Sequence, residues 1–204
     1  MEHIRRAVAA PVVAASLIFL AACAGSAGTG GARFGEAYPQ PPDGEVVGQG
    51  TVIDAAGQAE LCLGPVDESY PPQCSGVPLV GWSWDGIDGS ETSGDVRWGT
   101  YAVQGTYDGE SLTVTAPPVM LALYDPMPLS DPTDGEPGQG DEASLLAHQN
   151  ELTDRLGDQY LSSSVEHGYL WVDVVWDDGT LQDAADAEFG AGPVIVRSAL
   201  RELG

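Results

Sequence analysis

Hydrophobic and polar residues alternate along the middle of the chain, which predicts β-strands that each bury one face. The clearest case is the run 97–117, where the Asp-Gly dipeptide at 108–109 predicts a two-residue hairpin loop of type I′. With this loop, one face of the hairpin is largely apolar and the other is polar, as in a sheet that covers a core. The predicted opposite pairs are Tyr107–Glu110, Gly105–Leu112, Val103–Val114 and Tyr101–Ala116.

Three further runs have the composition of strands, and glycines inside them indicate bulges or sharp bends. The predicted strands are Val46–Ile53, Ala59–Gly64 and Val77–Trp84. Five short, bent strands favour a small antiparallel β-barrel, because closure removes unpaired edges. Residues 46–124 are therefore predicted to form a β-rich domain. An OB-like barrel is the first hypothesis for it, and a small sandwich is the alternative.

The pattern changes to helix, strand, helix, strand after residue 142. A helix is predicted over Ala143–Leu156, with Asp141 as its N-cap and Gly157 as its stop signal. Its predicted buried stripe consists of Leu145, Gln149, Leu152 and Leu156. The run 168–178 is predicted to be a strand, because its apolar residues recur at every second position.

A second, shorter helix is predicted over Leu181–Glu188, where Thr180 and Asp183 resemble a capping box. Gly190 is predicted to end this helix, and the run 194–200 gives the last strand. Residues 143–204 are thus predicted to form a compact α-β-α-β unit. The expected fold class of the whole chain is α+β.

Two stretches of low hydrophobicity separate these regions. Residues 23–45 are rich in Gly, Ala and Pro, which predicts a flexible tether. Residues 125–142 are acidic and rich in Pro and Gly, which predicts a linker between the β-rich domain and the α/β unit.

The first 22 residues have the layout of a secretory signal peptide. Arg5 and Arg6 precede an uncharged run from Ala7 to Leu20, and the small residues Ala21 and Ala22 follow. A membrane-spanning helix needs about 20 predominantly apolar residues, so this shorter run predicts export rather than a permanent span.

The stretch Leu20-Ala21-Ala22-Cys23 resembles the lipobox of bacterial lipoproteins. The resemblance covers only this end of the chain. It implies cleavage before Cys23, a diacylglyceryl group on the Cys23 sulfur and further acylation such as palmitate. Two or more acyl chains anchor a protein stably. The expected location is therefore outside the cytoplasm, on the cell membrane, with the membrane as a partner through the lipid anchor.

Removing residues 1–22 takes away Glu2, Arg5 and Arg6, which leaves 30 acidic residues against 5 arginines and a formal charge of −25. Nucleic-acid recognition depends on clustered Lys and Arg, so this charge disfavours it. The chain contains no lysine beside abundant Ala, Gly and Asp, a composition typical of a GC-rich bacterial genome.

Cys62 and Cys74 are an even pair once Cys23 is assigned to lipidation. Disulfides persist outside the cytoplasm, and no further soft metal ligands lie near these two residues in the sequence. A Cys62–Cys74 disulfide is therefore predicted, in preference to a metal pair.

No catalytic motif stands out in the sequence. His148 and His167 have no metal-ligand spacing, and no nucleophile elbow is present. No catalytic residue, metal ligand or cofactor is therefore assigned. The acidic linker invites a weak calcium hypothesis, but its sequence departs from the EF-hand pattern, and a solvated linker is the favoured interpretation.

Aromatic residues beside acids give the one candidate binding patch, which consists of Trp82, Trp84 and Trp171. Asp85 and Asp88 follow the first two tryptophans, and Asp173 and Asp177 share one face of the run 168–178. Tryptophan beside acid favours a sugar-binding or glycosidase-like cleft, whereas acids this abundant also form pairs by chance. Core packing is the favoured interpretation of Trp82 and Trp84. Tyr169, Trp171 and Val175 are expected to be buried between a helix and the β-rich domain.

The sequence therefore predicts an exported, disulfide-bridged, lipid-anchored protein of the cell envelope. A non-catalytic binding or structural module is the favoured function, with an envelope protein or a glycan as its partner. The alternative is an envelope hydrolase that uses paired carboxylates on glycans. An enzyme requires one buried acid with a raised pKa beside an ionised one in an open cleft.

Overall fold

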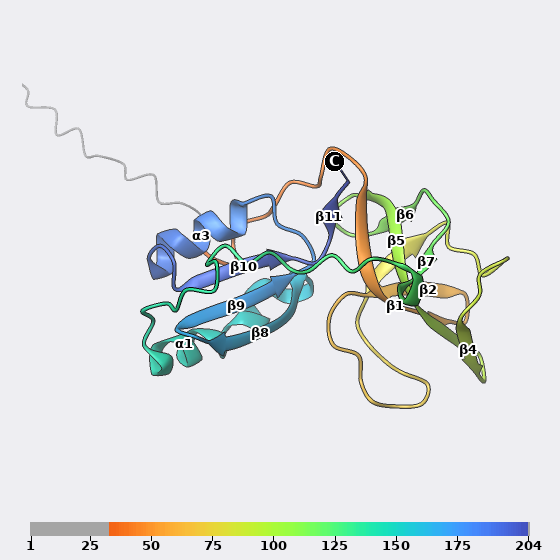
Figure 1. Ribbon diagram of the computed structural model, residues 1–204, viewed down its shortest axis with the longest axis horizontal. Coiled ribbons are helices and arrows are strands. Elements are labelled where there is room, and N and C mark those ends of the chain that lie inside the picture. The colour runs from red at the N-terminus through yellow and green to blue at the C-terminus, as the bar shows by residue number, and fades with distance from the viewer. Residues whose placement is uncertain (1–32, 204) are drawn as a thin grey trace, which may run out of the picture. The chain divides into compact units, whose positions relative to one another are not determined.

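A closed β-barrel occupies the first half of the described chain, which covers residues 33–203 of a computed structural model (Figure 1). Its five strands are β1 (Val46–Ala55), β2 (Gln58–Cys62), β3 (Val77–Val80), β5 (Val96–Tyr107) and β6 (Leu112–Val114). They pair in the order β1-β2-β3-β6-β5, and β5 pairs again with β1, which closes the sheet. The predicted α+β class and the barrel are confirmed, and the sandwich alternative is wrong. The barrel is not wholly antiparallel, because β3 and β6 run parallel.

The predicted signal peptide (residues 1–22) and the lipidation site Cys23 lie outside the described residues. No helix within residues 33–203 combines the length and the apolar character needed to span a bilayer.

The β5–β6 hairpin has a different register from the predicted one. Tyr107 lies opposite Leu112 and Gly105 opposite Val114, so the loop has four residues, 108–111. The Asp108 carboxylate makes this longer loop favourable, because it accepts hydrogen bonds from the backbone N–H groups of Ser111 (2.7 Å) and Glu110 (3.0 Å). These bonds also lower the pKa of Asp108. A shift of two residues keeps every side chain on its predicted face, so the apolar face still lines the core.

Strand β3 ends at Val80, four residues earlier than predicted. Gly81 adopts a φ of +79°, which terminates the strand and turns the chain. Three short elements that were not predicted follow: β4 (Ser90–Ser93), β7 (Val119–Met120) and the 3-10 helix η1 (Leu121–Leu123). Both β4 and β7 pair with β5.

The second half of the chain builds a three-stranded sheet with helices α1 (Glu142–Gln149), α2 (Leu152–Leu156) and α3 (Thr180–Phe189). The strands β8 (Tyr160–Glu166), β9 (Tyr169–Val174) and β10 (Val194–Ser198) lie in the order β10-β9-β8, with β9 and β10 parallel. The 3-10 helix η2 (Gly157–Gln159) precedes β8. Strand β8 was not predicted, since its Ser-rich sequence carries no clear alternation.

The helix boundaries follow the capping chemistry only in part. Asp141 is the N-cap of α1, where it accepts a hydrogen bond from Ser144 N (3.0 Å), and Gly157 ends α2 as predicted. The single predicted helix Ala143–Leu156 is interrupted at 150–151. The predicted capping box of α3 is wrong: Asp177 accepts the hydrogen bonds of the first turn, from Leu181 N (2.8 Å) and Gln182 N (3.3 Å).

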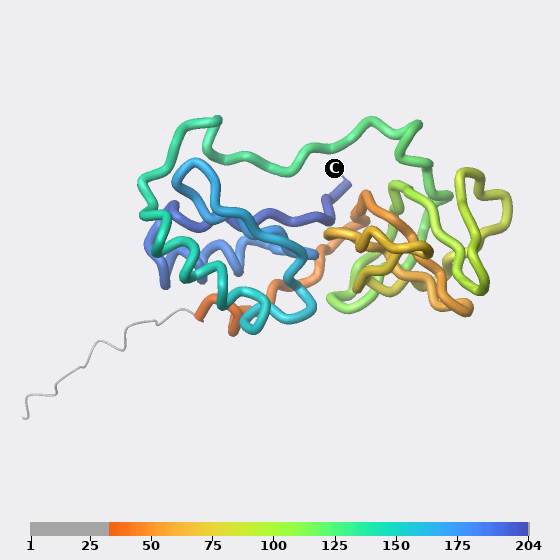
Figure 2. The backbone as a smooth tube through the Cα atoms, turned by 90° about the horizontal axis from the view of Figure 1, so that it is seen from below, coloured from red at the N-terminus to blue at the C-terminus, as the bar shows by residue number. Residues whose placement is uncertain are grey.

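One apolar cluster lies between the three-stranded sheet and the helices. It includes Leu145, Leu152, Leu170, Val172, Leu181 and Ala185, all buried. Phe34 and Ala37, from the stretch predicted as tether, belong to the same cluster. Figure 2 shows this N-terminal segment in orange-red. Phe34 and Ala37 of the predicted tether are thus packed, whereas residues 23–32 lie outside the described residues.

An ion pair holds this N-terminal segment in place. The Glu188 carboxylate accepts hydrogen bonds from Phe34 N (3.0 Å) and from the Arg155 guanidinium (2.6 Å). Arg155 also donates to the Phe34 carbonyl oxygen. The hydrogen bond from Arg155 lowers the pKa of Glu188, which therefore remains ionised at neutral pH.

The barrel and the three-stranded sheet have separate apolar clusters, but the chain segments that follow β9 and β10 join the barrel cluster. Val175, Trp176 and Leu200, which follow β9 and β10, pack into the barrel cluster. The last strand, β11 (Arg201–Glu202), pairs with the start of β1. The predicted linker 125–142 is largely exposed but is held at several points, such as the hydrogen bond from Gly138 N to His167 O (2.8 Å).

Cys62 at the end of β2 is bonded to Cys74, as predicted. The bond closes the loop that carries the chain from β2 to β3, with a sequence separation of 12 residues.

Replacing both cysteines with serine should lower the free energy of unfolding by about 3 kcal/mol, because a cross-linked loop of this size has less entropy to gain on unfolding. Urea denaturation of the C62S/C74S variant against the oxidised wild type measures this loss. Ser75→Ala, in the same loop, is the matched control and should be close to neutral. Equal unfolding midpoints for C62S/C74S and wild type would contradict the expected role.

Candidate functional site

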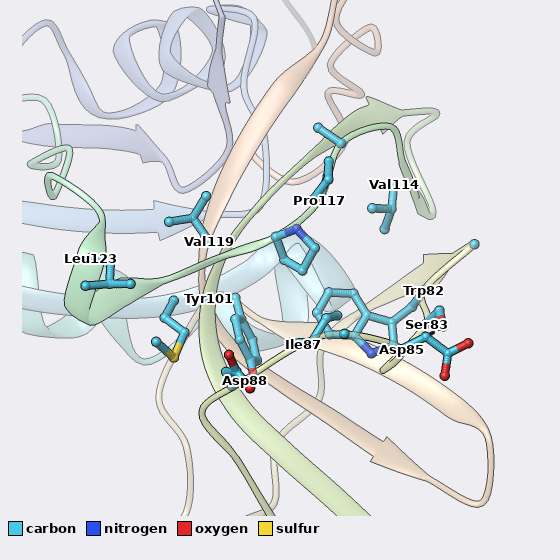
Figure 3. A pocket seen from close by; sticks show the side chains of 15 residues that line it. Trp82, Ser83, Asp85, Ile87, Asp88, Tyr101, Val114, Pro117, Val119 and Leu123 are labelled. Carbon is cyan, nitrogen blue, oxygen red and sulfur yellow. Dashed lines mark hydrogen bonds between the residues drawn. The ribbon is translucent and has the colours of Figure 1, made fainter.

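A cavity of about 480 Å³ opens in the barrel wall, within the range of ligand sites of about 300–1,000 Å³ (Figure 3). It is lined by the loop 81–88, by Tyr101 of β5 and by the segment 114–123. The 81–88 loop exists because Gly81 ends β3 early, and Gly86, with a φ of +73°, allows its second turn. We refer to this space as the barrel cavity.

Three aromatic rings pack together under the barrel cavity. Trp82 and Trp84 meet edge to face with ring centroids 5.0 Å apart, and Tyr101 lies 5.7 Å from Trp82 and 6.0 Å from Trp84. Both tryptophans are half-buried against the barrel core. The predicted core-packing role of Trp82 and Trp84 is therefore confirmed, although neither residue lies in a strand.

The two tryptophans differ in how their indole N–H groups are satisfied. Trp84 Nε1 donates to the Asp54 carboxylate (2.8 Å), and the Arg97 guanidinium lies 4.5 Å from the centre of the Trp84 ring. Trp82 Nε1 is buried and has no hydrogen-bond partner among residues 33–203. An unpaired buried donor costs about 1–3 kcal/mol. Trp84 therefore anchors the 81–88 loop, whereas the Trp82 ring lines the cavity.

Apart from Tyr101, the polar side chains that line the barrel cavity all come from the 81–88 loop, which also contributes Trp82 and Ile87. The loop contributes the polar side chains Ser83, Asp85 and Asp88, all exposed. The segment 114–123 contributes only apolar ones: Val114, Ala116, Pro117, Pro118, Val119, Met120 and Leu123. Leu123 is 74% exposed and Val119 is 40% exposed. The cavity thus has an acidic side and an aliphatic side.

Tyr101 connects the floor of the cavity to the loop. Its hydroxyl donates to the backbone oxygen of Asp88 (2.8 Å). Burial raises the pKa of Tyr101, so the hydroxyl keeps its proton and this hydrogen bond at neutral pH. The 81–88 loop is therefore held at two points: Trp84 in its middle bonds to Asp54, and Asp88 at its end bonds to Tyr101.

The structure does not bring the three predicted tryptophans into one patch. Trp171 lies on β9 of the other sheet, 5.7 Å from the Tyr169 ring and with the Arg197 guanidinium 4.8 Å above it. Val175 is buried in the barrel cluster as expected, whereas Tyr169 and Trp171 stay half-exposed. Only Trp82 and Trp84 share a site.

The candidate carboxylates have structural partners or lie in solvent. Asp173 forms an ion pair with Arg197 (2.7 Å). Burial raises the pKa of Asp177, but this side chain accepts the hydrogen bonds of the first turn of α3. Asp85 and Asp88 line the barrel cavity and are both exposed. The buried acid beside an ionised partner that a hydrolase requires is not formed at this cavity.

His148 and His167 lie outside the barrel cavity. His148 stacks on Phe189 at 4.5 Å, and His167 occupies the β8–β9 turn with a φ of +52°. In the linker, Asp131 accepts hydrogen bonds from the N–H and hydroxyl of Thr133. Within residues 33–203, no three His, Cys, Asp or Glu side chains gather in a geometry that would hold a metal ion.

The sequence pointed to the loop side of the barrel cavity but not to its aliphatic side. Tyr101 was expected only as a core residue, and the segment 114–123 was not considered for a site. The feature of the sequence that could have indicated this segment is the apolar run after Pro117-Pro118, which is too short to form a buried helix of its own.

Comparison of the chain with protein-family models, with curated proteins and with solved structures finds no match in any of the three. Evidence for function therefore comes from the residues and their arrangement.

Trp84→Phe should reduce the free energy of unfolding by about 1–3 kcal/mol more than Trp82→Phe does. The first change removes a hydrogen bond to a carboxylate and a cation–π contact, whereas the second removes a donor that has no partner. Urea denaturation of both variants measures the difference, and each serves as the size-matched control for the other. Equal losses would contradict the anchoring role of Trp84.

Proposed function

We propose that this protein is a lipid-anchored, non-catalytic binding module of the envelope of a GC-rich bacterium, and that its ligand site is the barrel cavity. The observation that carries the proposal is the two-sided lining of that cavity. Leu123 and Val119 expose aliphatic surface beside the acidic 81–88 loop, although the barrel core lies next to them. Apolar surface that stays exposed beside a formed cavity is typical of a binding site.

The proposed barrel type is OB-like. Five strands that close through β1 and β5, with a parallel β3–β6 pair, support this assignment. OB-folds bind oligonucleotides through the loops after the first and fourth strands. Those loops, 56–57 and 108–111, do not line the barrel cavity, and the formal charge of −25 opposes a phosphate backbone. A ligand other than nucleic acid is therefore proposed.

The non-catalytic assignment follows from the surroundings of the acids. A general acid on a glycosidic bond needs a raised pKa, which burial provides. Asp85 and Asp88 are exposed, and the one described aspartate with a raised pKa, Asp177, caps α3. These positions support binding rather than hydrolysis.

The proposed anchor rests on the signal-like residues 1–22 and the lipobox-like Leu20-Ala21-Ala22-Cys23. The packed segment begins at Phe34. About ten residues therefore separate Cys23 from the folded part, a length that spans up to about 35 Å when extended.

Cys23→Ala should release the protein from the membrane fraction, because acylation requires the thiol. Fractionation of cells by ultracentrifugation, with detection of the chain in membrane and soluble fractions, measures the change. Ser26→Ala is the matched control and should stay in the membrane fraction. Retention of the Cys23→Ala chain in the membrane would refute the anchor.

The cavity is tested with residues 24–204, which contain the whole compact unit 31–204, as bait in an envelope extract. Leu123→Ser removes exposed aliphatic surface from the cavity, and Leu146→Ser makes the same change on α1, where Leu146 is 43% exposed. Wild type and Leu146→Ser should retain the same material, and Leu123→Ser should lose it. Equal recovery on all three baits would refute the cavity as the binding site.

A further inference from the structure

We propose that the barrel cavity binds an extended, positively charged and amphipathic peptide segment of a partner protein. This inference rests on the proposed function, since it names the ligand of the same cavity. Four features of the cavity support it: the distribution of its polar groups, its negative charge, the packing of its aromatic rings and the free edge of β7.

The distribution of polar groups matches a ligand with two faces. Ser83, Asp85 and Asp88 lie along the loop, and the residues of segment 114–123 that line the cavity are all apolar. A peptide in extended conformation presents alternate side chains to opposite sides. Basic residues would meet the aspartates while apolar residues meet Val119 and Leu123.

The charge of the cavity favours a cationic ligand. Its lining contains two aspartates and no Arg, Lys or His. The surrounding mature chain carries a formal charge of −25, which attracts a basic segment and repels an acidic one.

The aromatic rings argue against a saccharide. Sugars stack on the open face of an aromatic ring and use hydrogen-bond partners on several sides. Here Trp82 lies between Trp84 and Tyr101, with centroid distances of 5.0 and 5.7 Å, and packs on the core. The Tyr101 hydroxyl already donates to Asp88 O, and the lining residues of segment 114–123 have no polar side chains.

The backbone of β7 provides the place for an extended segment. β7 (Val119–Met120) pairs with β5 on one side, and no strand among residues 33–203 pairs with its other side. Peptides add to such a free strand edge through main-chain hydrogen bonds, while side-chain pockets give specificity. Both residues of β7 line the cavity.

The experiment titrates residues 24–204 with a blocked, fluorescent hexapeptide that alternates leucine and lysine, and reads its anisotropy. A hexapeptide with glutamate in place of lysine is the charge control, and a neutral chitin tetrasaccharide, used as a competitor, is the glycan probe. We expect saturable binding of the lysine peptide, weaker binding in high salt, no binding of the glutamate peptide and no competition by the saccharide.

Two variants assign that binding to the two sides of the cavity. Leu123→Ser should raise the Kd about tenfold, because it removes an apolar contact that the bound peptide buries. Asp85→Asn with Asp88→Asn should raise the Kd about threefold to tenfold and reduce its salt dependence. The matched controls, Leu146→Ser and Asp43→Asn with Asp183→Asn, alter exposed residues outside the cavity and should leave the Kd unchanged.

The possible failures are distinguishable. Saccharide binding, measured directly by calorimetry, that Leu123→Ser abolishes while the lysine peptide does not bind would overturn the inference and leave the proposed binding site intact. Equal affinity for the lysine and glutamate peptides would overturn the role of the aspartates. Peptide binding that no cavity variant alters would overturn both the inference and the site. Circular dichroism of each variant verifies that the fold is kept.

Discussion

Strand β1 is hydrogen-bonded along both of its edges, and the rest of the structure depends on this double pairing. One edge pairs with β5 over ten residues, from Val46 to Ala55, and the other pairs with β2 and, at its start, with β11. The first two pairings close the barrel and enclose one apolar core. The third brings the C-terminal end of the chain back to the same strand, and Val175, Trp176 and Leu200, which follow β9 and β10, pack into the barrel core.

The barrel cavity forms where strand β3 of the closed sheet ends. β3 ends at Gly81, and the chain then crosses the barrel wall as the 81–88 loop instead of continuing to pair. Trp84 on Asp54 and Tyr101 on Asp88 hold this loop, while the segment after β6 stays apart and forms the opposite wall. Two anchors on one wall of a preformed cavity reduce the ordering cost of binding a ligand.

The acidic composition has a different meaning at the surface and at the cavity. Over the surface it provides solubility and long-range repulsion of anions. At the cavity, two of the many carboxylates lie in the same lining as exposed aliphatic groups, and this combination supports the proposed ligand that is both basic and apolar. A lipid anchor would confine such a module to the membrane surface, within reach of envelope proteins.

The sequence by itself determined the features that local chemistry decides: the alternating faces of β5, the cap of α1 at Asp141, the stop at Gly157, the Cys62–Cys74 pair and the α+β class. Strand register, the end of β3, the burial of Phe34 and the separation of Trp171 from Trp82 were decided only by the tertiary structure. The burial of Phe34 depends on a partner distant in the chain, Glu188. The register and the end of β3 involve local hydrogen bonds at Asp108 and a positive φ at Gly81, which the hydrophobic pattern does not show. Periodicity shows which residues become buried, but it does not show against which residues they pack.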